Sequence, residues 1–235
     1  MLTLSFDTNF NKTYIVLKKD GNIINSEILE SKDGNYHSAF FIPTLQNILK
    51  TNKIQIKDIN AIGVNIGPGS FTGIRAGITI ARVLCQQTNC KLIGINSLKI
   101  LSKLNKEGTK TIVILDARKN RVYYAEFEND KTIKEPTLID KDELTNVIDN
   151  NAFIITDKSI GEFLSAKNIN TIQYENNDKD IGLFLSDIIA GIVLLSAIPP
   201  APITHHFIFD IFISLSAFLL RFQVLRLPYN LIVHR

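Results

Sequence analysis

Apolar runs alternate with polar turns along the first hundred residues. Within these runs the apolar residues recur either at every second position, as in strands, or at every third or fourth position, as in helices. Alternating or β-branched runs predict strands over 2–7, 13–17, 23–29, 59–66 and 91–95. Apolar positions at helical spacing predict helices over 37–50 and 72–88, and a short helix starts at Ser97. Pro43 is expected to kink the first helix or to mark a later start.

The same pattern starts again after residue 110. Strands are predicted over 111–115, 122–127, from 132 onward and over 153–156, with helices over 142–148 and 158–166. The two starts align without a gap at an offset of 109 residues, so that Asp7 falls on Asp116 and Asn11 on Asn120. The sequence therefore predicts an α/β fold of two similar β-β-β-α-β-α halves that face each other.

This repeat gives three segments: a first half over 1–105, a second half over 106–180 and an atypical tail over 181–235. From Ile181 onward the chain has no Lys and no Glu, although Lys is plentiful before. Its apolar pieces are interrupted at Asp187, at Pro199–Pro200 and at Asp210, so each is shorter than the roughly 20 residues of a membrane span. No membrane role is expected, and a reading-frame error or a divergent end is favoured.

Composition adds two constraints. The net charge of +3 is too small to indicate nucleic-acid binding by itself, because the basic residues form no long run. The two cysteines, Cys85 and Cys90, form no CxxC motif, so reduced thiols in a cytoplasmic protein are expected, and the N-terminus carries no secretion signal.

The run 67–75, which reads GPGSFTGIR, is the most informative motif. It joins a predicted strand to a predicted helix, and free amides at such a helix start suit phosphate or carboxylate. It has no Lys for a Walker A loop and misses the dinucleotide spacing by one residue, so a tight turn without nucleotide is favoured. A phosphate-binding cleft is the alternative, because ligands of such sheets lie beyond the strand ends; its candidate residues are Asp7, Thr8, Gly67, Gly69, Ser70, Asp116 and Arg118.

Small residues recur every four positions on the helix after this turn, at Gly73, Gly77 and Ala81. Such a stripe lets another backbone approach closely. It either packs on the chain's own sheet or meets the helices of a partner.

The run 67–75 resembles the signature of the TsaB (YeaZ) family. Further matches follow in order: Phe6-Asp7-Thr8, His37, the run 58–62, Asp116-Ala117-Arg118 and Val122-Tyr123. The resemblance covers about 1–130 well and 131–180 loosely. It implies an actin/sugar-kinase/Hsp70-like (ASKHA, ribonuclease H-like) fold and an accessory role in biosynthesis of threonylcarbamoyladenosine (t6A) in tRNA.

The resemblance also implies partners. These are a catalytic TsaD-like subunit, bound through a four-helix bundle, and a TsaE-like ATPase, with tRNA contacted only indirectly and a homodimer when the chain is alone. No cofactor of its own is expected, although ATP or ADP could lie at the subunit interface. The implied interface residues are His37, Phe41, Leu45, Thr72, Gly73, Ala76, Gly77, Ile80, Ala81 and Leu84.

No catalytic or metal-binding residue is expected. The family's catalytic relative holds a metal with an HxxxH pair and an Asp, whereas His37 is the only histidine of residues 1–180. A small-molecule kinase is the alternative, in which Asp7 and Asp116 would hold magnesium-nucleotide instead of capping strand ends. A metallopeptidase is less favoured. Arg118 and Arg121 are expected to form ion pairs within the domain, with tRNA or a partner as the other option.

Overall fold

The first half of the chain forms a five-stranded sheet. The computed structural model describes residues 1–30 and 37–197. In the first sheet the strand order is β3-β2-β1-β4-β5. The three N-terminal strands are antiparallel, and the other two run parallel to β1. Their bounds are β1 Leu2–Asp7, β2 Lys12–Lys19, β3 Asn22–Glu30, β4 Ala61–Asn65 and β5 Lys91–Ile95.

The second sheet repeats this arrangement in the order β10-β9-β6-β7-β8. The strands β1, β2 and β3 begin 109 residues before β6, β7 and β8. The duplication predicted from the aligned starts is therefore confirmed. The bounds are β6 Thr111–Asp116, β7 Arg121–Glu128, β8 Lys131–Asp140, β9 Phe153–Thr156 and β10 Ile172–Gln173.

The helices follow the strands much as the apolar spacing predicts. The first helix runs from His37 through Pro43 to Thr51, so the proline does not delay its start. The α-helices are α1 His37–Thr51, α2 Phe71–Thr88, α3 Ser97–Ser102, α4 Leu144–Val147, α5 Lys158–Ser165 and α6 Ile181–Ala197. Short 3-10 helices are η1 Ile56–Asp58, η2 Lys141–Glu143 and η3 Tyr174–Asp180.

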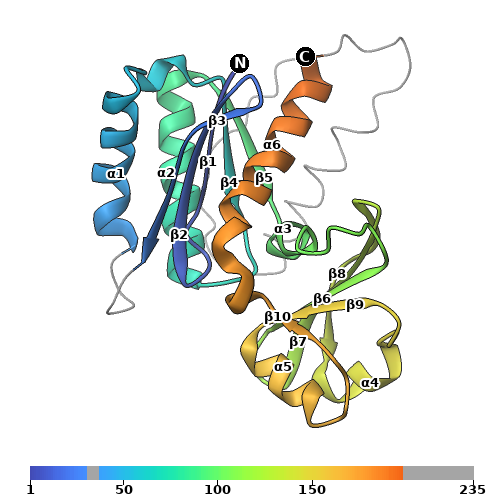
Figure 1. Cartoon of the computed structure of the whole chain (residues 1–235). Coiled ribbons are helices and arrows are strands. Elements are labelled where there is room, and N and C mark those ends of the chain that lie inside the picture. The colour runs from blue at the N-terminus through green and yellow to red at the C-terminus, as the bar shows by residue number, and fades with distance from the viewer. Residues whose placement is uncertain (31–36, 198–235) are drawn as a thin grey trace, which may run out of the picture. The chain divides into compact units, whose positions relative to one another are not determined.

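Helices α1 and α2 cover one face of the first sheet (Figure 1). Alternate residues of β1 and β4 point to this face, among them Phe6, Ile62 and Val64. The Phe6 ring meets the ring of Phe41 edge-on, with centroids 4.8 Å apart. Burial of these apolar side chains is what holds the two helices on the sheet.

Helix α6 packs on the opposite face of the same sheet. Ile181, Leu185 and Ile189 are fully buried in a core that also contains residues of the second sheet. Gly63 makes room for Ile189, because a Cβ at Gly63 would lie 2.2 Å from the Ile189 Cγ1 atom. The ammonium of Lys18, itself almost fully buried, pairs with Asp187.

The composition change at residue 181 therefore does not mark the end of the packed fold. Residues Met1–Leu195 form one compact unit, which includes most of α6. The predicted tail beyond 197 lies outside the described residues. Within the described part of the chain, no helix has both the length and the apolar character needed to cross a bilayer.

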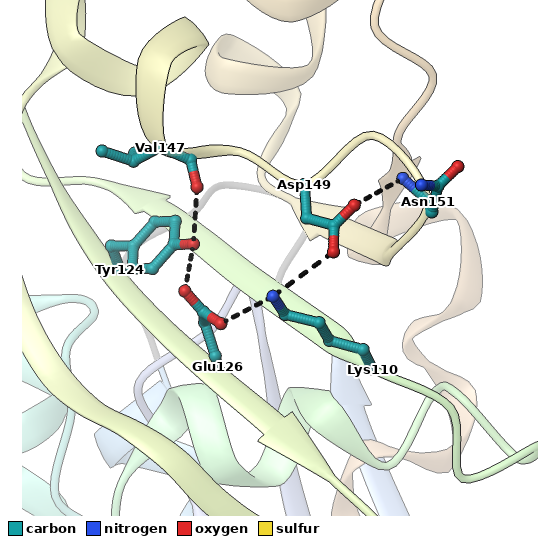
Figure 2. Close-up of polar contacts among 6 residues, drawn as sticks. All are labelled: Lys110, Tyr124, Glu126, Val147, Asp149 and Asn151. Carbon is teal, nitrogen blue, oxygen red and sulfur yellow. Dashed lines mark hydrogen bonds and ion pairs between the residues drawn. The ribbon is translucent and has the colours of Figure 1, made fainter.

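A polar network ties the second sheet to the loop after α4 (Figure 2). The Lys110 ammonium lies 3.1 Å from Glu126 Oε2 and 3.4 Å from Asp149 Oδ2. The Tyr124 hydroxyl donates to Glu126 Oε1 at 2.7 Å. Every charged member of the network therefore has a partner of opposite charge, and the network links β7 to the loop after α4.

Candidate functional site

Asp7 organises the backbone around the glycine-rich turn. Its carboxylate accepts hydrogen bonds from the Asn9 amide at 2.7 Å and from the Asn65 side-chain amide at 2.6 Å. The side chain of Asn65 in turn accepts from the Gly67 amide at 2.9 Å. Burial raises the pKa of Asp7 to about 6, against the lowering effect of these hydrogen bonds. Asp7 is thus a buried structural carboxylate.

Helix α2 sits directly on the β1–β2 loop because glycine occupies the two helix positions that face this loop, Gly73 and Gly77. A Cβ at Gly73 would lie 1.9 Å from the Thr8 carbonyl oxygen, and one at Gly77 would lie 2.6 Å from Thr8 Oγ1. The Thr8 hydroxyl donates to the Gly73 carbonyl at 2.7 Å. Ser70 caps the helix, since its hydroxyl accepts from the Gly73 amide at 3.2 Å. The predicted tight strand-to-helix turn is confirmed.

The small-residue stripe therefore packs on the chain's own sheet. Gly73, Gly77 and Ala81 are buried, and so are Phe41 and Leu45 of α1. The prediction that these five residues form a partner interface is wrong, because their surfaces are already covered by the chain's own core.

The other predicted interface residues lie differently. Thr72 is exposed, and Ala76, Ile80 and Leu84 are half-buried on α2. His37 is the first residue of α1, and its side chain lies outside the described ones. For these five residues the interface stays a prediction.

An open cleft of about 940 Å³ lies beyond the strand ends. The glycine-rich turn forms one wall, and the β6–β7 hairpin, the start of α5 and the start of η3 contribute further residues. Its lining residues are Asn9, Phe10, Asn11, Pro68, Gly69, Ser70, Phe71, Leu115, Asp116, Ala117, Arg118, Tyr123, Asp157, Lys158, Ser159, Tyr174 and Glu175. The glycine-rich turn and Asp116 thus line one cleft, whereas Asp7, which was expected to converge with them, does not.

Four of the seven predicted cleft residues line it: Gly69, Ser70, Asp116 and Arg118. Asp7, Thr8 and Gly67 are buried and do not line it. The proposed pairing of Asp7 with Asp116 around magnesium is therefore wrong as a geometric prediction. Asp7 is fully buried, and its carboxylate oxygens are already hydrogen-bonded within the protein.

The two β-hairpins are not equivalent at this point. Asp7 pairs with Tyr14, whereas Asp116 pairs with Val122, so the second register is displaced by one residue relative to the repeat. Arg118, Lys119 and Asn120 all have positive φ, between 50° and 61°. This left-handed loop leaves the Asp116 side chain exposed, while the Asp7 side chain turns inward.

The protein's own carboxylates occupy the amides at the start of α5. The Asp157 side chain accepts from the amides of Ile160, at 2.9 Å, and Asp116, at 2.5 Å. The Glu175 side chain accepts from the Lys158 amide at 3.0 Å, and burial raises the pKa of Glu175. The amides at a helix start normally attract a phosphate, but here an incoming phosphate would be repelled by these carboxylates.

The predicted ion pairs of Arg118 and Arg121 are not formed in the described part of the chain. Arg118 contributes a backbone amide to Asp116 Oδ1 at 3.2 Å, and the side chains of both arginines are exposed. Over residues 1–30 and 37–197, no group of three or more His, Cys, Asp or Glu side chains could hold a metal ion.

Sequence reasoning missed Asp157, Lys158, Tyr174 and Glu175. Asp157 directly follows β9, so the rule that ligands lie beyond parallel strand ends could have found it. Tyr174 and Glu175 could not be found by this rule, because they begin the 3-10 helix η3 and reach the cleft only once the second half has folded.

Known proteins resemble this chain in sequence. Residues 22–170 match the family model TsaD, described as tRNA N6-adenosine threonylcarbamoyltransferase. The TsaB protein of Escherichia coli K12, named for tRNA threonylcarbamoyladenosine biosynthesis, is 34% identical over 134 residues, which are 56% of this chain and 57% of that protein. The TsaB protein of Bacillus subtilis 168 is 28% identical over 142 residues, 60% of this chain and 61% of that protein. The chain thus spans less than two thirds of these relatives.

Two solved structures from Pseudomonas aeruginosa have the same fold. A protein described as similar to the peptidase YeaZ gives a TM-score of 0.60 at 16% identity, over 73% of this chain and 82% of that one. The structure of YeaZ itself gives 0.59 at 18% identity, over 70% and 78%. Together with the repeated sheets, this likeness confirms the α/β fold of two similar halves. Because the family model covers well over half of the chain, the chain belongs to the TsaD family that the model describes, and the TsaB proteins above are among its relatives.

Proposed function

We propose that this chain is the non-catalytic partner subunit of a tRNA threonylcarbamoyladenosine-forming complex. The observation that carries the proposal is its similarity to proteins named for that biosynthesis, the TsaB proteins of Escherichia coli and Bacillus subtilis. The partner is a catalytic TsaD protein, and a TsaE-like ATPase and tRNA join the assembly through that partner.

The docking surface is the outer side of α1 and α2, which we call the α1–α2 face. It comprises Phe40 and Ile42 of α1 and Thr72, Ala76, Ile80, Val83 and Leu84 of α2. Phe40 is 61% exposed, Val83 is 46% exposed and Ile42 is 41% exposed. Removing such apolar surface from water is favourable by about 25 cal/mol per Å². Two helices of the catalytic subunit would cover this face in a four-helix bundle.

The buried stripe changes how this surface must be tested. A bulky residue at Gly77 would collide with Thr8 and Val64 inside the fold, so loss of binding in Gly77→Leu would report misfolding. Substitutions at exposed positions separate binding from folding. When the catalytic subunit is absent, the same face would join two copies of the chain. ATP or ADP would bind only in the complex with the catalytic subunit, at the interface between the two proteins.

The test is t6A formation in tRNA by an extract of the same organism from which this chain has been removed, with and without the purified chain added back. We expect the chain alone to form no t6A, and the extract to form it only when the chain is present. Phe40→Asp is expected to lower this activity at least about tenfold at limiting concentration, since a charge would be buried in the interface. Ile133→Asp, at a similarly exposed position on β8, serves as the control.

Two results would contradict the proposal. One is t6A formation at the full rate without the chain. The other is tight binding of magnesium-ATP by the isolated chain in calorimetry together with phosphoryl transfer to a small molecule, which would favour a kinase.

A further inference from the structure

Two cysteine side chains meet at the C-terminal end of α2. Cys85 lies in the last turn of the helix, and Cys90 follows its C-cap residue, Asn89. Asn89 has a left-handed backbone, with φ of 54°, which turns the chain back toward the helix. The two Sγ atoms are thereby brought to 2.9 Å, and neither cysteine is in a disulfide.

The surroundings of the two thiols differ. Cys85 is 9% exposed and belongs to the core between α1, α2 and the first sheet. Burial, together with the contact to Cys90, raises the pKa of the Cys85 thiol to about 12. Cys90 is half-buried, so a small reagent reaches it more easily than it reaches Cys85. An oxidant is therefore expected to attack Cys90 first.

We propose that Cys85 and Cys90 form a reversible dithiol–disulfide site whose oxidant is a hydroperoxide. The Cys90 sulfur attacks the peroxide oxygen, which gives Cys90 sulfenic acid and one molecule of water or alcohol. The Cys85 sulfur then displaces hydroxide from that sulfenic acid, and the hydroxide takes up the Cys85 proton and leaves as water. Both sulfurs are oxidised by one electron each, and the peroxide bond is reduced by two.

The two sulfurs already lie close to bonding distance. A disulfide has sulfurs about 2.05 Å apart, so the atoms must approach by less than about 1 Å from their present contact. The ring closes over only the four residues between the cysteines, and Cys90 lies just before β5. The bond would fasten the last turn of α2 to the start of β5. This inference does not depend on the proposed role in t6A formation.

The experiment uses the full, folded chain at neutral pH with hydrogen peroxide in modest excess. We expect both free thiols to disappear together, the intact mass to fall by two hydrogens, and digestion to give a peptide linking Cys85 to Cys90. Dithiothreitol should restore both thiols. In Cys85→Ala the resolving sulfur is gone, so Cys90 is expected to accumulate sulfenic acid that dimedone traps, at least about tenfold more than in the unchanged chain.

Cys90→Ser is the matched control, and its buried Cys85 should keep its thiol under the same treatment. The proposal is overturned if the unchanged chain accumulates sulfinic acid at Cys90 while Cys85 stays reduced. It is also overturned if the only disulfides join two chains, or if neither thiol reacts until the protein is unfolded.

Discussion

Replacement of Gly73 by alanine tests the seating of α2 on the β1–β2 loop. The new Cβ would lie 1.9 Å from the Thr8 carbonyl oxygen and 2.8 Å from its carbonyl carbon. Ordinary contact needs about 3.4 Å or more, so helix and loop must separate by roughly 1.5 Å. Both obstructing atoms belong to the backbone, and no side-chain rotation relieves the collision.

The magnitude follows from three effects. Overpacking a core costs about 1–3 kcal/mol or more, and loss of the Thr8–Gly73 hydrogen bond costs about 1 kcal/mol. Alanine gains about 1 kcal/mol over glycine within a helix, which offsets part of this loss. We expect Gly73→Ala to lower the free energy of unfolding by about 1–3 kcal/mol, measured by urea denaturation followed by circular dichroism.

Two further glycines calibrate this experiment. At Gly77 a Cβ would meet the Thr8 hydroxyl at 2.6 Å, and this side-chain atom moves more easily than a backbone carbonyl, so Gly77→Ala should lose less. Gly191 lies in α6, where a Cβ would have no atom of the described residues within 4 Å, so Gly191→Ala should gain about 0.5–1 kcal/mol. Equal stability of Gly73→Ala and the unchanged chain would refute the described seating of α2.

Three other substitutions probe the core. Folding raises the pKa of Asp7 from 3.8 to about 6, so the folded state loses stability as the pH rises and Asp7 ionises. Between pH 4 and pH 7 the unchanged chain should therefore lose up to about 3 kcal/mol of stability relative to Asp7→Asn. A difference in urea midpoints that does not change with pH would count against this. Gly63→Ala should destabilise the chain, but less so in an Ile189→Ala background, whereas additive losses would mean that α6 does not pack there. Asp187→Asn removes the partner of the buried Lys18 ammonium and should cost about 1 kcal/mol in thermal or urea unfolding, because Asp187 itself is exposed. This loss should exceed that of Lys18→Met, which removes the charge, and the reverse order would contradict the ion pair.

The fold could be predicted well because its signals are local. Strand alternation and helical spacing depend on neighbouring residues, and the gap-free offset of 109 residues revealed the duplication. The place of α6 could not be found in this way. Its abrupt change in composition suggested a foreign tail, whereas Ile181, Leu185 and Ile189 fill a core that only the assembled sheets create.

The site was predicted only in part, because burial is a tertiary property. The spacing of Gly73, Gly77 and Ala81 correctly indicated a close backbone approach, but it could not tell which backbone approaches. The repeat correctly aligned Asp7 with Asp116, yet the second hairpin has a register displaced by one residue and a left-handed loop, and its carboxylate is exposed whereas that of Asp7 is buried.

The most direct test of the central claim is the dissociation constant between this chain and TsaD of the same organism, measured by sedimentation or calorimetry. We predict that the unchanged chain binds with a dissociation constant in the micromolar range or below. Val83→Asp on the α1–α2 face should weaken binding at least about tenfold, equivalent to about 1.4 kcal/mol. The control Ile133→Asp should change the dissociation constant less than about twofold. Absence of a complex, or equal effects of the two substitutions, would contradict the account.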